Sequence, residues 1–210
     1  MDVRAHWDAV WGSRAPEEAS WYQADPSASL QLVRDAGLDE SAWILDVGGG
    51  ASTFTDHLLS AGRRSISVLD ISAEAIHRAQ LRLGEQADLV EWFVADVRTF
   101  VPPHRWDLWH DRAAFHFLTE PEDRRAYLET LRRSLVPGGQ MILATFSLDG
   151  PKKCSGLDVV RYSHATLSRE LGDEYELVQT AEETHTTPSG GSQAFLFCRF
   201  SRRPGTSRGP

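Results

Sequence analysis

Short apolar runs alternate with amphipathic stretches along most of the chain. Each run is short enough for a buried strand, and the stretches between them are bounded by Ser or Gly, which favour helix ends. The strands that this pattern predicts cover residues 43–47, 65–70, 89–95, 106–109 and 140–146. The predicted helices cover residues 26–36, 52–60, 72–83, 122–135 and 163–171. Strands that alternate with helices predict a parallel sheet with right-handed crossovers.

The two ends of the chain depart from this alternation. Residues 175–183 and 193–200 are apolar runs separated by Thr-Pro-Ser-Gly-Gly, which indicates an antiparallel hairpin. Residues 1–25 contain three Trp and one Tyr without a strand pattern, so we expect helical turns that lie over the rest of the molecule. The segment 201–210 is rich in Arg, Gly, Ser and Pro and is predicted to be disordered.

Composition narrows the possible partners. The 210 residues fit one domain, and the net charge of −8 (22 Lys and Arg, 30 Asp and Glu) argues against a nucleic-acid partner. No apolar stretch approaches the ~20 residues of a membrane span, and the N-terminus is too polar for a signal peptide, so we expect no membrane partner and a cytoplasmic location. The two cysteines form no disulfide framework, and no Cys or His pair has the close spacing of a metal site, so no metal is expected.

The first predicted strand ends in an acid and three glycines, Asp46-Val47-Gly48-Gly49-Gly50. The second strand ends in Asp70, so both acids are predicted at one edge of the sheet, as in a nucleotide-binding βαβ unit. Glycines allow the backbone to approach a ligand closely. The dinucleotide fingerprint requires a further glycine where this chain has Thr53, which makes a pyrophosphate ligand less expected.

With the terminal hairpin, this pattern resembles the class I methyltransferases that use S-adenosylmethionine. The resemblance implies a Rossmann-like, seven-stranded, mostly parallel sheet with helices on both faces, formed by residues 26–200. It also implies S-adenosylmethionine as cofactor and S-adenosylhomocysteine as product, with Asp70 on the ribose and Asp96 on the adenine. The cofactor-binding residues implied are Asp46, Gly48, Gly49, Gly50, Ser52, Asp70, Ile71, Asp96, Val97 and His110.

Residues outside the cofactor motif are similar to the thiopurine S-methyltransferase and thiol/halide methyltransferase branch. The similarity lies in the N-terminal aromatics, in Asp-Arg-Ala-Ala at 111–114, and in the segment 149–162. It implies that residues 1–25 form an aromatic lid and that His110 and Arg112 are the catalytic candidates. The substrate-binding residues expected are Trp21, Tyr22, Phe115, His116 and Tyr162. The chain departs from the branch at 154–158, where Cys-Ser-Gly-Leu-Asp replaces a Gly-Pro-Pro motif.

The sequence therefore predicts methyl transfer by in-line displacement, in which the enzyme mainly holds the reacting atoms in line. Only His110 and His116 are nearby base candidates, and neither stands out. A thiol needs little help from a base, so a small thiol or similarly soft acceptor is favoured. A protein lysine methyltransferase and a non-catalytic cofactor-binding regulator remain alternatives, and a nicotinamide dehydrogenase is a more distant one. The identity of the acceptor and the oligomeric state stay open.

Overall fold

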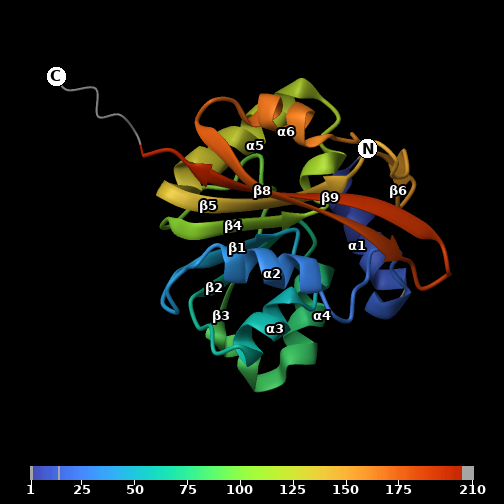
Figure 1. The fold of residues 1–210 in the computed structure, drawn as a ribbon. Helices are drawn as coiled ribbons and strands as arrows, with labels where there is room; N and C mark the ends of the chain where they lie inside the picture. Colours follow the sequence, from blue (N-terminus) through green and yellow to red (C-terminus); the bar gives the residue numbers. More distant parts are fainter. Residues whose placement is uncertain (1, 14, 205–210) are drawn as a thin grey trace.

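A seven-stranded sheet forms the centre of the computed structural model, which describes residues 2–13 and 15–204 (Figure 1). The strand order is β3-β2-β1-β4-β5-β9-β8. The first five are parallel, and β9 pairs antiparallel with both β5 and β8. Their bounds are β1 Ile44–Val47, β2 Ile66–Asp70, β3 Val90–Val94, β4 Trp106–Arg112, β5 Leu135–Phe146, β8 Tyr175–Thr186 and β9 Ser192–Arg202. The predicted fold class is confirmed.

Helices cover both faces of the sheet, with α5 and α6 on one side and α2, α3 and α4 on the other (Figure 1). The helix bounds are α1 Val3–Ser13, α2 Ser27–Asp35, α3 Phe54–Ser60, α4 Ala73–Leu83, α5 Pro121–Ser134 and α6 His164–Leu171. Short 3-10 turns lie at Pro16–Glu18, Gly84–Leu89 and Phe115–Phe117. Each face of the sheet has its own apolar core, because strand residues alternate between the two faces. None of the helices in the described part of the chain is long and apolar enough to cross a membrane.

Several predicted boundaries shift in the structure. Strand β4 continues three residues past its predicted end, to Arg112, and β5 begins at Leu135 instead of residue 140. The predicted turn at 137–139 lies inside β5, where the register between β4 and β5 is irregular and Gly138 has a φ of +81°. The Pro-Gly-Gly sequence that predicted a turn therefore forms a bulge within the strand, because the residues on both sides of it still pair with β4.

Of the two serines expected to cap helices, Ser72 is the N-cap of its helix, whereas Thr53 takes the place expected for Ser52. Ser72 and Ser163 cap α4 and α6, and each side-chain oxygen accepts from the backbone amide three residues later. Helix α3 begins at Phe54, later than predicted, and its amide donates to Ser52 Oγ at 3.1 Å.

The ends of the chain also differ from expectation in extent. Strand β9 runs to Arg202, beyond the predicted end of the domain at residue 200, while 205–210 of the predicted tail lies outside the described residues. The segment after β5 forms a small hairpin of its own, β6 Lys153–Cys154 and β7 Leu157–Asp158. This β6–β7 hairpin lies near α1, at the same end of the sheet (Figure 1).

Candidate functional site

The glycine turn after β1 is shaped by two carboxylates of the protein itself. Gly48 has a φ of +69°, and its amide donates to the carbonyl of Leu69 at 2.7 Å. A Cβ on Gly49 would lie 2.1 Å from Asp46 Oδ2, and one on Gly50 would lie 2.7 Å from Asp70 Oδ2. Any side chain at either position would collide with an acid, so the glycines are what allow both carboxylates to sit against the turn.

Asp70 is held at the end of β2 by backbone amides. Oδ2 accepts from the Gly50 amide at 3.0 Å, and Oδ1 accepts from the Ser72 amide at 2.8 Å. Burial raises the pKa of Asp70 to about 6, although these two hydrogen bonds lower it. The residue also lines a cavity of about 600 Å³, so its carboxylate can accept hydrogen bonds from a ligand there.

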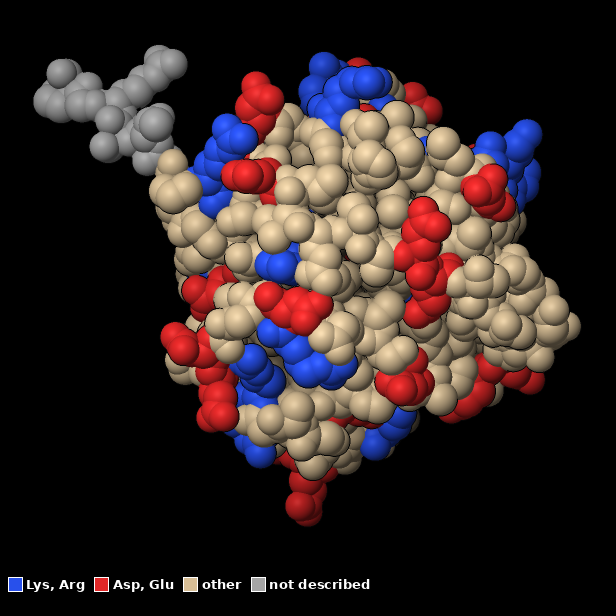
Figure 2. Space-filling view, viewed as in Figure 1, with Lys and Arg blue, Asp and Glu red and all other residues tan. Residues whose placement is uncertain are grey.

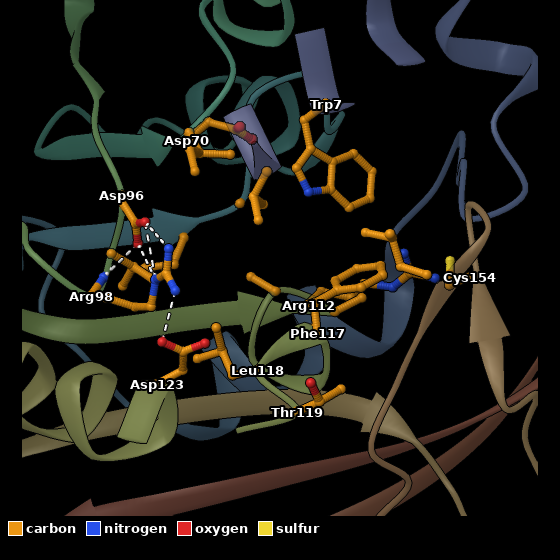
Figure 3. A pocket seen from close by; sticks show the side chains of 18 of the residues that line it. Trp7, Asp70, Asp96, Arg98, Arg112, Phe117, Leu118, Thr119, Asp123 and Cys154 are labelled. Carbon is orange, nitrogen blue, oxygen red and sulfur yellow. Dashed lines mark hydrogen bonds and ion pairs between the residues drawn. The ribbon is translucent and has the colours of Figure 1, made fainter. Parts of the chain in front are cut away.

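The same cavity extends to the ends of the neighbouring strands (Figure 3). Ile71, Asp96 and Val97 line it beside Asp70, which is the combination expected for a ribose and an adenine. An adenosine fits these residues because they offer carboxylate acceptors together with apolar side chains. The structure thus brings four of the predicted cofactor residues to one wall.

Asp96 is engaged by an arginine that the sequence did not point to. Arg98 forms an ion pair with Asp96 at 2.6 Å and a second one with Asp123 of α5 at 2.7 Å (Figure 3). Partial burial alone would raise the pKa of Asp96, but the hydrogen bonds and charge of Arg98 outweigh it and hold the pKa below its usual value. An adenine amine would therefore share Asp96 with Arg98.

His110 lies apart from this wall, which corrects its predicted role as a base. It is buried, with Nδ1 at 2.7 Å from Asp46 Oδ1 and Nε2 at 2.9 Å from Ser29 Oγ. Its ring stacks on Phe54 with 4.0 Å between centroids. Both ring nitrogens are already hydrogen-bonded, so His110 positions Asp46 and is not available to take a proton from an acceptor.

A second, smaller cavity of about 50 Å³ lies on the other side of the glycine turn. It is lined by predicted cofactor residues Asp46, Gly48, Gly49, Ser52 and His110, and by Trp21, Tyr22 and Arg112. Asp46 Oδ2 is buried without a hydrogen-bond partner in the described structure. A free carboxylate oxygen beside bare backbone is suited to an ammonium group, such as that of the methionine end of the cofactor.

Arg112 lines both cavities from the end of β4. Its Nη1 donates to the carbonyl oxygen of Trp21 at 2.9 Å, and its guanidinium carbon lies 4.5 Å from the centre of the Phe195 ring. Burial lowers the pKa of Arg112 to about 10, so the side chain remains charged at neutral pH.

Three predicted substrate residues are core residues instead. Phe115 is fully buried and packs on Tyr127, while Tyr162 packs on Phe115 with 5.7 Å between ring centres. Burial, with a smaller effect of the Arg112 charge, lowers the pKa of His116 to about 3, so it is neutral. None of these three lines either cavity. The chain turns after β4 into the 3-10 turn Phe115–Phe117, which directs Phe115 and His116 inward.

The opposite half of the large cavity has aromatic walls, of which the sequence predicted the N-terminal part but not Phe146 and Phe195. Trp7 and Trp21 come from the N-terminal segment, and Phe117 follows β4. Phe146 ends β5, and Phe195 lies in the first half of β9. Cys154 of the β6–β7 hairpin also lines it. Across residues 2–13 and 15–204, no group of three or more His, Cys, Asp or Glu side chains is arranged to hold a metal ion.

Comparison with known proteins agrees with this geometry. Residues 44–139 match a family model described as a methyltransferase domain. Malonyl-[acyl-carrier protein] O-methyltransferase 1 of Ilyobacter polytropus is 31% identical over 145 residues, which are 69% of this chain and 50% of that protein. Nodulation protein S of Sinorhizobium fredii is 31% identical over 101 residues, 48% of this chain and 46% of that protein. The chain thus spans about half the length of these curated relatives.

Solved structures share the fold over most of the chain. A protein studied for the conversion of a disulfide bond into a thioacetal group during echinomycin biosynthesis superposes with a TM-score of 0.78, at 19% identity, over 97% of this chain and 93% of that one. The N-methyltransferase NodS of Bradyrhizobium japonicum, in complex with S-adenosylhomocysteine, gives a TM-score of 0.66 at 18% identity over 86% and 89%. These relatives do not confirm the narrower thiopurine and thiol/halide branch. The family match shows that residues 44–139 match a methyltransferase domain, and the chain as a whole has the fold of class I methyltransferases.

Proposed function

We propose that the chain transfers a methyl group from S-adenosylmethionine to a small acceptor that carries a thiol or a similarly soft nucleophile. The cofactor supplies an electrophilic methyl on a sulfonium sulfur. In this proposal Asp70 binds the ribose hydroxyls, Asp96 and the flanking Ile71 and Val97 hold the adenine, and the glycine turn leaves room for the methionine end. The observation that carries the proposal is the placement of these groups around one cavity at the carboxyl ends of β1, β2 and β3.

The acceptor half of the cavity favours a nucleophile that needs no base. Both histidines near it are unsuited to proton transfer, because His110 is hydrogen-bonded at both nitrogens and His116 is buried outside the cavity. A thiol with a pKa near ~8.5 is a few per cent thiolate at neutral pH, whereas a lysine amine with a pKa near ~10.4 is almost entirely protonated. The protein's contribution is then to align the nucleophile and exclude water.

The aromatic walls support a small acceptor. Trp7, Trp21 and Phe117 pack edge to face, with 5.8 Å between the rings of Trp7 and Trp21 and 5.0 Å between those of Trp7 and Phe117. Aromatic faces also attract a sulfonium cation. The N-terminal segment thus acts as a lid over the reacting groups in this proposal, and a small apolar molecule suits the space beneath it.

A protein acceptor is the second candidate, because one relative is named alpha N-terminal protein methyltransferase 1 of Caenorhabditis elegans, at 29% identity over 103 residues, 48% of this chain. The test is incubation with S-adenosylmethionine labelled in its methyl group, with a panel of small thiols, amines and carboxylic acids, and with a protein extract. We expect label in small-molecule products of the wild type and none with Asp70→Ala. Label confined to protein bands would favour the second candidate, and tight cofactor binding without any transfer would favour a regulatory role.

A further inference from the structure

Arg112 is a half-buried cation whose hydrogen-bonding capacity is only partly used. One nitrogen, Nη1, donates to the Trp21 carbonyl, while Nε and Nη2 are shielded from solvent and have no partner in the described structure. Two acids, Glu183 and Asp46, act on it through their charge but neither is hydrogen-bonded to it. Glu183 accepts from Gln23 Nε2 at 2.6 Å, and Asp46 is bonded to His110.

Other arginines with little exposure form ion pairs in the same molecule. The side chains of Arg124 and Arg202 are 14% and 11% exposed, and each forms an ion pair at 2.7 Å, with Glu170 and Glu174 respectively. Burying a charge without a counter-charge is costly. The missing partner of Arg112 is therefore a feature that needs an explanation, and a ligand anion provides one.

Cys154 does not supply the missing negative charge. Its thiol lines the cavity close to Arg112, on the side away from Asp70 and Asp96 (Figure 3). Burial raises the pKa of Cys154 to about 11, although hydrogen bonding to Ser20 and the charge of Arg112 lower it, so the thiol is neutral at physiological pH. The acceptor half of the cavity thus combines aromatic walls with one uncompensated positive group.

We propose that Arg112 binds the carboxylate of the methyl acceptor, and that the acceptor is an apolar, ring-sized organic acid whose thiol or similarly soft group receives the methyl. Nε and Nη2 form one edge of the planar guanidinium, the edge that matches the two oxygens of a carboxylate. Phe195 beneath the guanidinium and the Trp21 carbonyl fix its plane. A bound anion also offsets the positive sulfonium of the methyl donor. This assignment rests on the proposed function, because it identifies the acceptor of that reaction.

Entry of such an acid requires a local movement, because the free edge of Arg112 is covered by neighbouring atoms. We assign this movement to the β6–β7 hairpin, which lies at the surface on the Cys154 side of the cavity. It has two residues in each strand, and its Lys153–Asp158 ion pair is 63% and 73% exposed at the two side chains. A shift of this hairpin outward would open the Cys154 side of the cavity to an acceptor.

The test compares acids with their uncharged amides on protein saturated with S-adenosylhomocysteine. Calorimetric titrations use phenylacetate against phenylacetamide, and benzoate against benzamide. We expect the wild type to bind each acid at least about tenfold more tightly than its amide. Arg112→Gln should abolish this preference, Arg112→Lys should keep part of it, and the exposed-site control Arg125→Gln should leave it unchanged. In all variants we expect affinity for S-adenosylhomocysteine within about threefold of the wild type.

The outcomes separate this inference from the proposed function. Equal binding of acids and amides by the wild type would overturn it, and this measurement needs no variant to fold. A loss of S-adenosylhomocysteine affinity above tenfold in Arg112→Gln, without loss of affinity for 5′-methylthioadenosine, would assign Arg112 to the methionine carboxylate and also overturn it. Failure of the wild type to bind S-adenosylhomocysteine at all would instead reject the proposed function and this inference with it.

Discussion

At the scale of single residues, the two acids beside the glycine turn are prepared for different tasks. Asp46 is buried and bonded to His110, whereas Asp70 receives only backbone amides and lines the large cavity. Asp70 is thus oriented without using a side-chain partner that a ligand would have to displace. Its pKa is raised because burial removes water from the carboxylate and so disfavours the charged form.

If Asp70 binds the ribose as proposed, cofactor binding should depend on pH. Because its pKa is about 6 in the folded protein, the carboxylate that accepts the ribose hydroxyls forms as the pH rises from 5 to 7, and affinity for S-adenosylhomocysteine should rise with it. Asp70→Asn should bind about tenfold more weakly at pH 7.5, roughly 1.4 kcal/mol, and show a flat profile. Calorimetry across this range is the measurement, and an unchanged pH profile in the variant would remove Asp70 from ribose binding.

The same shift has the opposite effect on folding, which serves as the control. A carboxyl whose pKa is raised from 3.8 to about 6 stabilises the folded state most below pH 3.8, and this contribution is lost as the pH rises through 6. The weaker binding of S-adenosylhomocysteine that we expect at pH 5 is therefore not explained by unfolding due to Asp70. Thermal melts at pH 5 and pH 7 check that the protein is folded in both titrations.

Ala113 is strained where the chain leaves β4. It has a φ of +75°, a left-handed conformation that costs a residue with a Cβ roughly 1–2 kcal/mol. Ala113→Gly should relieve this strain, offset by about 0.4–1 kcal/mol of extra freedom in the unfolded chain, for a gain of up to about 1.6 kcal/mol. Differential scanning calorimetry should show a rise of roughly 3–6 °C in Tm at most. Ala114→Gly, at a φ of −88°, is the matched control and should lower Tm.

At the scale of elements, a hydrogen bond from α4 adds to the aromatic packing that holds helix α1 over the cavity. Asp8 Oδ1 accepts from Ser72 Oγ at 2.6 Å, and Ser72 in turn caps α4 beside Asp70. Trp7 and Trp11 on the same helix line the large cavity. The lid and the cofactor wall are therefore joined at the start of α4, although they lie about 65 residues apart in sequence.

Removing the hydrogen bond between Asp8 and Ser72 should lower turnover of the acceptor more than it lowers affinity for the cofactor. We expect Asp8→Ala to lower kcat/KM for the acceptor several-fold, and deletion of residues 1–25 to abolish turnover, while S-adenosylhomocysteine affinity falls less in both. Asp25→Ala, an exposed acid of the same segment, is the control and should behave as wild type. Normal methylation by the truncated protein would show that the segment is not a lid.

At the scale of the whole molecule, the strand order concentrates the site at one edge of the sheet. Strands β2, β1 and β4 are neighbours and parallel, so their carboxyl ends place Asp70, the glycine turn and Arg112 together. Strands β9 and β8 extend the sheet beyond β5, and Phe195 of β9 lines the large cavity. The net charge is −8, and acidic and basic side chains are mixed over the face that Figure 2 shows.

A ligand that bridges this edge should stabilise the entire domain. S-adenosylhomocysteine at 100 times its Kd should add about 2.7 kcal/mol to the free energy of unfolding, which corresponds to a Tm increase of roughly 5–10 °C. The dinucleotide NAD at the same concentration should leave Tm unchanged, because the turn has Thr53 where the dinucleotide fingerprint needs glycine. Stabilisation by NAD and not by S-adenosylhomocysteine would contradict the cofactor assignment.

The sequence by itself determined the parts of this protein that depend on neighbours in the chain. The glycine turn, Asp70 and the capping serines each lie within a few residues of the groups they serve, so strand, turn and helix patterns predict them. Alternating strands and helices also determined the sheet and its crossovers. These features follow from local backbone geometry, and the structure confirms the predicted fold.

Only the tertiary structure decided which side chains are free to act. His110 is occupied by Ser29, 81 residues away, and Arg112 is oriented by Trp21 and Phe195 from opposite ends of the chain. Phe115 and His116 follow the same strand but turn into the core. Hydrogen bonding and desolvation depend on contacts between distant segments, so the availability of a polar group could not be predicted from its residue type and position alone.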